Sequence, residues 1–294
     1  MKSGFVSIIG RPNVGKSTLI NSIIGRKIAI TSNKPQTTRN IIQGIYNEAD
    51  TQIVFVDTPG IHKPKHKLGK ALNRQAYYSI SDVDVVIMMV DITEKLGPGD
   101  MYVIEKLKEE DKPVILVLNK VDRIPKPEIL LKIEEYKDLY PFKEIVPLSA
   151  LKKDNVDTLI KVIKNYLTDS IKYYDDDTIT NKPMNFVIAE LVREKVFNYT
   201  EEEVPHSVTC LVEHVEKNNN AFNIHVSIIV DRDSLKKIII GKSGSKIKQI
   251  GIEAREEIEA LVGTKVYLDL FVKTIKKWRD KEKYLQEFGY HDFE

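Results

Sequence analysis

The residue pattern with the clearest chemistry is a glycine-rich loop at residues 10–17, which read G-R-P-N-V-G-K-S. An apolar run precedes the loop and an apolar-periodic segment follows it, as expected for a strand and a helix. Glycines let backbone N–H groups crowd around a phosphate, and the helix N-terminus adds positive potential. Lys16 would reach the β- and γ-phosphates of a nucleotide, and the Ser17 hydroxyl would ligate Mg²⁺. The pattern predicts a nucleotide-phosphate site formed by Gly10, Asn13, Val14, Gly15, Lys16, Ser17 and Thr18.

A second polar motif, D-T-P-G at residues 57–60, directly follows an apolar run at residues 53–56. An aspartate there can hold Mg²⁺ through a water molecule, so Asp57 joins Ser17 as a candidate metal residue. Gly60 would let its backbone N–H approach the γ-phosphate of a triphosphate. Alone, this motif is also typical of a plain turn, and its place after a strand gives it weight.

A third motif, N-K-V-D at residues 119–122, follows the apolar run at 114–118. The Asp122 carboxylate can accept hydrogen bonds from N1–H and the 2-amino group of guanine, whereas adenine offers neither donor. Because an unpaired buried carboxylate costs about 1–3 kcal/mol or more, the motif predicts selection of guanine. A backbone N–H after the next apolar run could reach guanine O6. The predicted base-reading residues are Asn119, Lys120, Asp122, Ser149 and Ala150.

The elements that must position these motifs alternate along the first 170 residues. Helical patterns lie between most of the apolar runs, and residues 155–167 place their apolar side chains on one helical face. Fully apolar strands separated by helices indicate an α/β fold with a mostly parallel sheet covered on both faces. Ligands bind such sheets beyond the carboxyl ends of the strands, where all three motifs fall. The predicted strands are residues 5–9, 53–56, 85–90, 114–118 and 144–148.

In this order and spacing, the motifs resemble those of the Ras-like and translation-factor GTPases over roughly residues 4–168. The resemblance implies a P-loop domain that binds GTP and GDP with Mg²⁺ and hydrolyses GTP. It also implies that Thr37 or Thr38 is the switch threonine, and we favour Thr38, whose hydroxyl would complete the Mg²⁺ shell only when the γ-phosphate is present. Loops at residues 30–40 and 58–80 would order with GTP and loosen after hydrolysis. The expected catalytic residues are Lys16, Thr38 and Gly60, and the expected metal residues are Ser17, Thr38 and Asp57.

One departure from the Ras pattern is Ile61, which stands where Ras carries a glutamine that orients the attacking water. The resemblance to GTPases with a hydrophobic residue at this place implies slow intrinsic hydrolysis. Some of those relatives carry an asparagine like Asn13 and use K⁺ where other GTPases use an arginine finger. The alternative is that Asn13 serves loop geometry alone, and the sequence leaves the two open.

Composition and charge indicate a two-domain soluble chain. Its 294 residues are 42% hydrophobic and 30% charged, with a net charge of +2. The longest apolar stretch is too short to cross a bilayer and no leader precedes the first motif, so we expect a cytoplasmic protein. The single cysteine, Cys210, excludes an internal disulfide. A polar, acidic break in the pattern predicts a nucleotide-binding domain at 1–170, a linker at 171–184 and a second domain at 185–294.

The second domain carries a Gly-x-x-Gly motif at residues 241–244, with isoleucines before it and a basic amphipathic segment after it. Alternating stretches predict a hairpin and then a third strand. The arrangement resembles an α+β KH domain of the bacterial type (type II) over about residues 185–285. The resemblance implies that the loop clamps the backbone of single-stranded RNA while lysines attract the phosphates. The expected RNA-binding residues are Ile240, Gly241, Lys242, Ser243, Gly244, Lys246 and Lys248.

The charge and the tail of this domain give further expectations. Residues 232–283 hold fourteen Lys or Arg against eight Asp or Glu, a local +6 that fits either a polyanion partner or a solvated helical surface. The tail from Lys273 to Tyr290 predicts one amphipathic helix whose aromatic side chains, such as Trp278, pack on the KH body rather than stack on bases. His62 and His66 lie in a basic stretch that predicts a solvated loop and no metal site.

The order of a GTPase and a bacterial-type KH domain is similar to that of the Era family, and residues 10–17, 34–39 and 251–255 are close to that family's own. The resemblance implies a switch that binds the 3′ end of small-subunit (16S) ribosomal RNA, assists 30S assembly and associates peripherally with the inner membrane. We expect a monomer. One alternative is a tRNA-modifying relative. Such enzymes use a catalytic cysteine, and this sequence has no cysteine near its C-terminus. Another is a scaffold or membrane-surface regulatory GTPase whose KH-like half binds protein.

Overall fold

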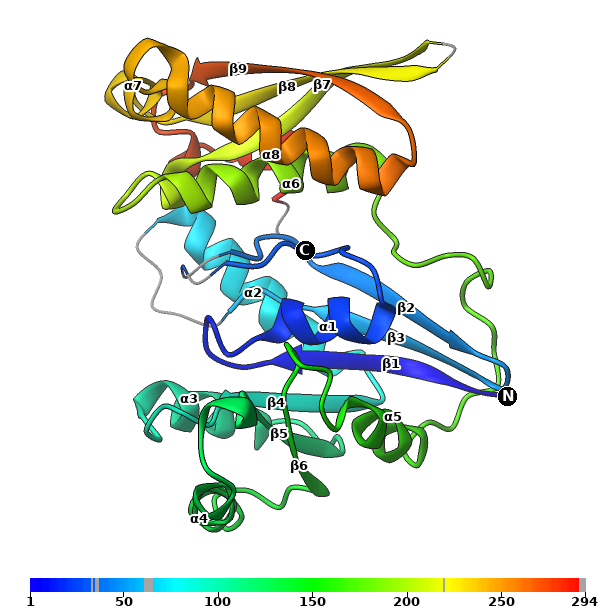
Figure 1. The fold of residues 1–294 in the computed structure, drawn as a ribbon. Helices are drawn as coiled ribbons and strands as arrows, with labels where there is room; N and C mark the ends of the chain where they lie inside the picture. The colour runs from blue at the N-terminus through cyan, green and yellow to red at the C-terminus, as the bar shows by residue number, and fades with distance from the viewer. Residues whose placement is uncertain (33, 35–36, 61–65, 219, 291–294) are drawn as a thin grey trace. The chain divides into compact units, whose positions relative to one another are not determined.

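The computed structural model describes residues 1–32, 34, 37–60, 66–218 and 220–290, with the backbone alone at 77–81. These residues divide into two compact units, one formed mostly by residues 1–181 and the other by residues 182–290. Each unit is a sheet with helices packed on it (Figure 1). Within the described ranges, no helix is both long and apolar enough to cross a membrane.

A six-stranded sheet forms the core of the amino-terminal unit, in the order β2-β3-β1-β4-β5-β6. Every neighbouring pair is parallel except β2 with β3. All residues of β3, β4 and β5 are buried, which is why these strands are continuous apolar runs in the sequence. The strands are β1 (Lys2–Ile9), β2 (Ile42–Glu48), β3 (Thr51–Asp57), β4 (Val85–Asp91), β5 (Val114–Asn119) and β6 (Glu144–Leu148).

Helices cover both faces of this sheet, so the expected P-loop α/β fold is confirmed. Side chains of α2, α3 and α4 join the strands in one apolar cluster, to which Ala76, Ile104 and Tyr136 belong. Figure 1 shows α1 and α5 in front of the sheet. The helices are α1 (Lys16–Ile24), α2 (Lys67–Ser81), α3 (Pro98–Leu107), α4 (Lys126–Tyr136) and α5 (Val156–Lys164).

The outer edge of β2 is paired with the segment that follows α5. The Ile45 N–H donates to the carbonyl oxygen of Ile179 at 3.0 Å, and the Asn181 N–H donates to that of Gln43 at 3.3 Å. These bonds continue the sheet by a short stretch of backbone. The segment that the sequence predicts as a linker therefore follows the sheet edge as far as Asn181.

A buried amide fixes the first part of this segment. Gln52, on β3, is 1% exposed. Its Nε2 donates to the carbonyl oxygen of Tyr174 at 2.8 Å, and its Oε1 accepts the N–H groups of Tyr173 and Tyr174 at 2.8 and 2.9 Å. One side chain thus bonds three backbone groups of this segment.

The carboxy-terminal unit has a three-stranded sheet in the order β7-β8-β9. The hairpin of β7 and β8 is antiparallel, and β9 runs parallel to β8. Apolar side chains from one sheet face join those of the helices in a single core that includes Val226, Ile250 and Ile258. The elements are α6 (Met184–Tyr199), β7 (Thr209–Asn218), β8 (Ala221–Val230), α7 (Asp233–Ile240), α8 (Ser245–Val262) and β9 (Lys265–Thr274).

The tail after β9 differs from the single amphipathic helix that the sequence predicts. It forms a 3₁₀ turn, η4 (Trp278–Asp280), and a short helix, α9 (Glu282–Glu287). The long-helix prediction is wrong because β9 continues to Thr274 and because Lys277 takes a φ of 54°, which a helix does not accommodate. Trp278 is fully buried, and its indole N–H donates to the carbonyl oxygen of Ser207 at 3.0 Å. The expected core role of this aromatic side chain is confirmed.

Candidate functional site

The polar motifs of the amino-terminal unit meet at the carboxyl ends of β1, β3, β5 and β6. The glycine-rich loop connects β1 to α1, and Gly15 stands at the N-cap of α1 with a φ of 104°. A Cβ at Gly15 would lie 2.3 Å from Nδ2 of Asn119, so the position accepts only glycine. The loop can therefore turn its N–H groups toward an anion at the start of the helix.

Lys16 is held inside this loop by its own backbone. Its Nζ donates to the carbonyl oxygens of Gly10 and Arg11 at 3.2 and 3.0 Å. The side chain is buried, and burial lowers the pKa of Lys16 to about 8, an effect that the nearby charge of Asp57 partly offsets. An anionic phosphate at the loop would favour the charged form of this amine.

Three side-chain oxygens converge beside Lys16. The Ser17 hydroxyl donates to Oδ2 of Asp57 at 2.8 Å, and Oγ1 of Thr38 lies 3.0 Å from Oγ of Ser17 and 3.3 Å from the same Asp57 oxygen. Burial raises the pKa of Asp57, although Lys16 and the two hydroxyls act against it. Hard oxygen donors in this arrangement suit Mg²⁺. The described residues contain no cluster of three or more His, Cys, Asp or Glu that could hold a metal, so this mixed hydroxyl and carboxylate set is the candidate metal site.

The two candidate switch threonines point to different partners. Thr38 joins the oxygen cluster and is 8% exposed. The Thr37 hydroxyl instead donates to the carbonyl oxygen of Lys34 at 2.6 Å. This geometry favours Thr38 for the metal role. Gly60 lies against Pro12, because a Cβ at Gly60 would come within 3.1 Å of that residue's backbone, whereas Ile61 lies outside the described residues.

The base-reading residues assemble around Asn119 at the end of β5. Its Nδ2 donates to the carbonyl oxygen of Val14 at 2.7 Å, and its Oδ1 accepts the N–H of Ala150 at 2.9 Å. The hydroxyl of Ser149 donates to Oδ1 of Asp122 at 2.5 Å. The structure thus brings the three predicted motifs and the loop after β6 into one site, with Thr18 in the first turn of α1.

Two residues of this site have no role in the sequence-based prediction. Asp91, the last residue of β4, accepts a hydrogen bond from the Lys120 ammonium, and Arg11 pairs with Asp100 at 3.2 Å. Burial acts to raise the pKa of Asp91, but the bonds from Lys120 and Thr93 outweigh it and leave this pKa below its usual range. A sequence signal existed for Asp91, because it follows an apolar run in the same way as Asp57 and Asn119 do.

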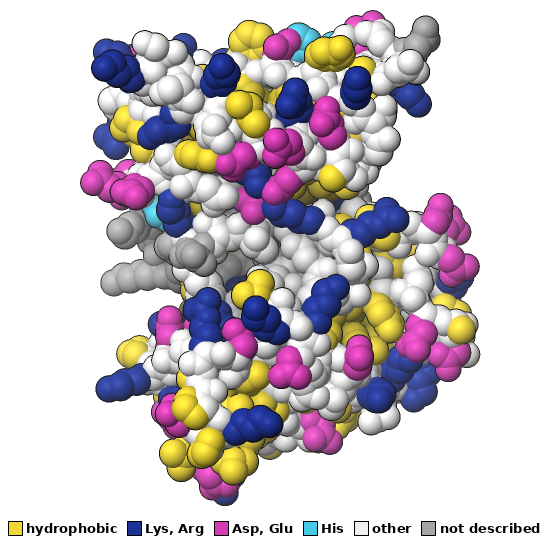
Figure 2. Space-filling model, in the orientation of Figure 1, with side chains coloured by type: hydrophobic (Ala, Val, Ile, Leu, Met, Phe, Trp, Pro, Cys, Tyr) yellow, Lys and Arg dark blue, Asp and Glu magenta, His cyan; other side chains and the backbone are white. Residues whose placement is uncertain are grey.

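The second candidate site lies at the turn between α7 and α8. Gly241 has a φ of 73° and Gly244 a φ of 76°, with the 3₁₀ turn η3 (Lys242–Gly244) between the helices. Lys242 and Lys248 are exposed, whereas Lys246 is half-buried. Figure 2 shows basic side chains interspersed with acidic ones on the visible face of this unit. The predicted residues, including Ile240 and Ser243, are therefore contiguous around one turn.

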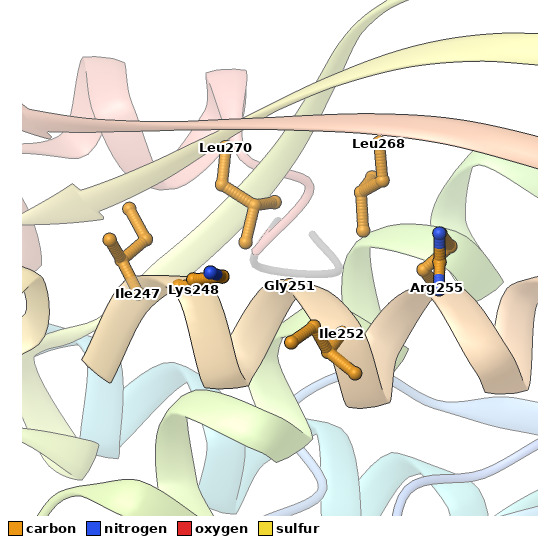
Figure 3. A pocket seen from close by; sticks show the side chains of 7 residues that line it. All are labelled: Ile247, Lys248, Gly251, Ile252, Arg255, Leu268 and Leu270. Carbon is orange, nitrogen blue, oxygen red and sulfur yellow. The ribbon is translucent and has the colours of Figure 1, made fainter. Parts of the chain in front are cut away.

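A groove continues from this turn between α8 and β9. It has a volume of about 350 Å³ and is lined by apolar and basic side chains. Figure 3 shows Leu268 and Leu270 directed from β9 toward α8, where Gly251 leaves room beneath Leu270. The sequence-based prediction missed Arg255 and both leucines, because the face of an edge strand that borders a groove has the same alternation as a core face. The lining residues are Ile247, Lys248, Gly251, Ile252, Arg255, Leu268 and Leu270.

Comparison with known proteins covers both units. A family model described as a 50S ribosome-binding GTPase matches residues 5–120, and a KH domain model matches residues 203–279. Two solved structures are similar over nearly the whole chain: a variant of Aquifex aeolicus Era bound to GDP and AlF₄⁻, and Era in complex with MgGDPNP and nucleotides 1506–1542 of 16S ribosomal RNA. Each is 43% identical, with 99% of both chains covered and a TM-score of 0.95.

Proposed function

The chain belongs to the Era family of GTPases, and from this premise we propose that it is a nucleotide-controlled switch that binds the 3′ region of small-subunit ribosomal RNA and assists 30S assembly. The observation that carries the nucleotide half is the convergence of Lys16 with the oxygens of Ser17, Thr38 and Asp57. The carboxylate of Asp122 supplies the guanine-reading acceptor at the other end of the same site.

Each side chain in the nucleotide site has a defined task in this proposal. Lys16 leaves its backbone acceptors to pair with the β- and γ-phosphates, while the N–H of Gly60 donates to the γ-phosphate. Ser17, Thr38 and Asp57 would hold Mg²⁺, which supplies positive charge to the β- and γ-phosphate oxygens when bound. Loss of the γ-phosphate removes a reason for Thr38 to stay in the cluster, so the loop that carries it is the element that senses the nucleotide.

Potassium is a further proposed cofactor that rests on Asn13 alone. The positive φ of Asn13, 65°, supports the alternative that an asparagine is needed here for loop geometry. Hydrolysis rates measured in equal concentrations of KCl and NaCl separate the two. A faster rate in KCl is expected if K⁺ binds, and equal rates would remove K⁺ from the proposal.

The RNA half of the proposal is supported by the Gly-x-x-Gly turn and the groove beside it. Loops of this kind clamp the backbone of unpaired nucleotides, and the exposed Lys242 and Lys248 supply attraction to phosphates. The RNA in the Era complex is the 3′ portion of 16S ribosomal RNA. We propose the same RNA as the ligand of this chain, with the 30S subunit as the larger partner.

Fluorescence anisotropy with an oligoribonucleotide of that 3′ sequence tests this assignment. The wild-type chain should bind it more tightly than a scrambled oligoribonucleotide of equal length, with an affinity that falls as salt rises. Gly241→Asp, which adds a negative charge and a clashing side chain to the turn, should lower the affinity by about tenfold or more. If the wild-type chain does not bind RNA at low salt in any nucleotide state, the RNA assignment fails and a protein ligand becomes the better interpretation.

The cellular setting is also a proposal. We infer a monomer that works in the cytoplasm and associates peripherally with the inner membrane, on the strength of the family resemblance. Light scattering after gel filtration measures the mass in solution, and co-sedimentation with anionic vesicles measures the membrane association. A stable dimer, or no vesicle binding at physiological salt, would remove the corresponding part.

A further inference from the structure

Asp91 connects three parts of the nucleotide site. Its side chain is 7% exposed at the end of β4. Its Oδ1 accepts the N–H and the hydroxyl of Thr93 at 3.0 and 2.7 Å, which fixes the carboxylate. Its Oδ2 accepts the ammonium of Lys120, from the base-reading motif at the end of β5.

Lys120 in turn reaches the phosphate loop. Its Nζ donates to the carbonyl oxygen of Asn13 at 2.9 Å. Lys120 has a φ of 72° and Asn13 a φ of 65°, a region that side-chain-bearing residues rarely occupy. Such conformations persist where surrounding contacts over-determine them, and the Asp91–Lys120–Asn13 chain of bonds is such a set of contacts.

We propose that Asp91 is a positioning residue for guanine recognition that acts through Lys120. The fixed carboxylate directs the ammonium toward Asn13, so the alkyl stem of Lys120 is held at the place where the purine plane would lie. Asp122, two residues further on, is kept in register with the phosphate loop by the same bonds. This inference rests on the proposed guanine site, to which it adds a residue that does not touch the nucleotide.

The bonding pattern distinguishes this role from a purely local one. An aspartate that only shaped its own turn would need its bonds to Thr93 and no others. The second oxygen of Asp91 instead accepts from a lysine 29 positions later in the chain, and that lysine is 21% exposed on its side chain. Because the pair is largely desolvated, removal of one charge leaves the other poorly compensated.

A double-mutant cycle tests the proposal with Asp91→Asn, Lys120→Met and the two combined. The substitution D91N keeps an amide oxygen that can accept from Thr93 but removes the charge that Lys120 needs, so it is the sharper probe. We expect each single variant to release labelled GDP about tenfold faster or more. We expect the double variant to be no worse than the more affected single variant, because both changes remove the same interaction.

A second readout excludes general damage to the fold. For Asp91→Asn, the single-turnover hydrolysis rate at saturating GTP should fall by a smaller factor than the affinity for GDP, because Asp91 acts on binding and not on the chemical step. Glu105→Gln is the matched control: it removes one charge from an exposed ion pair with Lys108 on α3, 2.7 Å apart, and should leave GDP release unchanged. If D91N does not fold, Asp91→Glu, which keeps the charge but displaces it, enters the same cycle with the same expectation.

Two outcomes would overturn the inference while leaving the proposed function intact. One is GDP release from the Asp91 variant at the wild-type rate. The other is strict additivity of the two single effects in the double variant, which would show that Asp91 does not act through Lys120. If instead the wild-type chain does not bind GDP, it is the proposed guanine site that fails.

Discussion

At the scale of single residues, the polar groups of the nucleotide site are hydrogen-bonded to one another. Lys16 donates hydrogen bonds to the backbone of its own loop, and Asp122 accepts a hydrogen bond from the hydroxyl of Ser149. Binding therefore exchanges internal bonds for bonds to the nucleotide. For Lys16 the exchange replaces neutral carbonyl partners with charged phosphates, so its free energy depends on protonation as well as on geometry.

The pKa of Lys16 makes nucleotide affinity depend on pH. In the free protein this pKa is lowered to about 8, so at pH 8 about half of the molecules carry a neutral amine. Phosphate binding raises the pKa again, because only the charged amine pairs with the anion. Affinity should be full below pH 8 and fall above it, by up to about tenfold per pH unit.

Titration calorimetry without divalent metal, in two buffers of different ionisation enthalpy, measures this linkage. At pH 8 we expect GDP binding to take up about half a proton. At a pH of about 7 the uptake should be smaller, because most of the amine is already charged. Equal heats in both buffers at pH 8 would contradict the assignment.

Thr37 and Thr38 provide a matched pair for the metal site. Thr38→Ala removes an oxygen from the cluster with Ser17 and Asp57, whereas Thr37→Ala removes a hydroxyl that donates to the backbone carbonyl of Lys34, outside that cluster. We expect Thr38→Ala to lower Mg²⁺-dependent hydrolysis by about a hundredfold and Thr37→Ala to change it by no more than a few fold. Steady-state phosphate release measures both, and the reverse order would assign the switch role to Thr37.

At the scale of elements, the sequence predicted best what is buried on both sides. The apolar run in β4 could only be a central strand, and its neighbours β3 and β5 were equally clear. The antiparallel strand β2 was not predicted, because its short alternation lies directly after the switch region. The tail-helix prediction failed for a related reason: the tail is basic and then aromatic, which suits an amphipathic helix, but the positive φ of Lys277 interrupts it. Local sequence patterns therefore predict burial well. They predict a break in the backbone poorly when the residue at the break is neither glycine nor proline.

The two glycines of the turn before α8 offer a matched test of the groove. Both have a positive φ, so alanine strains the backbone at either place. Only at Gly241 would a Cβ also collide, at 2.7 Å from Cβ of Lys246, whereas nothing lies within 4 Å of a Cβ at Gly244. We therefore expect Gly241→Ala to weaken RNA binding more than Gly244→Ala does.

Anisotropy titrations measure the RNA affinity of both alanine variants, and thermal unfolding measures their stability as a control. Gly244→Ala should lose about 1 kcal/mol of stability from its left-handed backbone. Gly241→Ala should lose more, because a φ of 73° with a ψ of 178° is a conformation that few residues other than glycine adopt. The difference in RNA affinity between them then reports the distortion at Gly241, to which its backbone strain and the collision with Lys246 both contribute. Equal affinities would show that the turn adjusts without moving that side chain.

At the scale of the whole molecule, the central question is whether the nucleotide controls the RNA site. β2 begins four residues after Thr38, and its outer edge carries the segment that leads to the carboxy-terminal unit. A displacement of Thr38 could therefore reach the segment that connects the two units through β2 and the hydrogen bonds on its outer edge. Such a route produces regulation only if the two nucleotide states differ in RNA affinity.

RNA affinity measured with GDP and with a non-hydrolysable GTP analogue tests this coupling. We expect the two affinities to differ by about fivefold or more, the lower end of common coupling strengths. Linkage requires the same factor in the reverse experiment, in which RNA changes the affinity for the analogue. Identical affinities in both states would leave the two units as independent binding modules.

The bonds between residues 179–181 and β2 also bear on how the amino-terminal half can be studied in isolation. A fragment that stops at residue 168 would expose the Ile45 N–H and its neighbours as a bare sheet margin, ready to recruit a strand from another molecule. A fragment that continues to Asn181 keeps residues 179–181 hydrogen-bonded to this edge. The shorter piece should self-associate at high concentration and the longer piece should stay monodisperse, so the stretch just after α5 is the wrong place to cut.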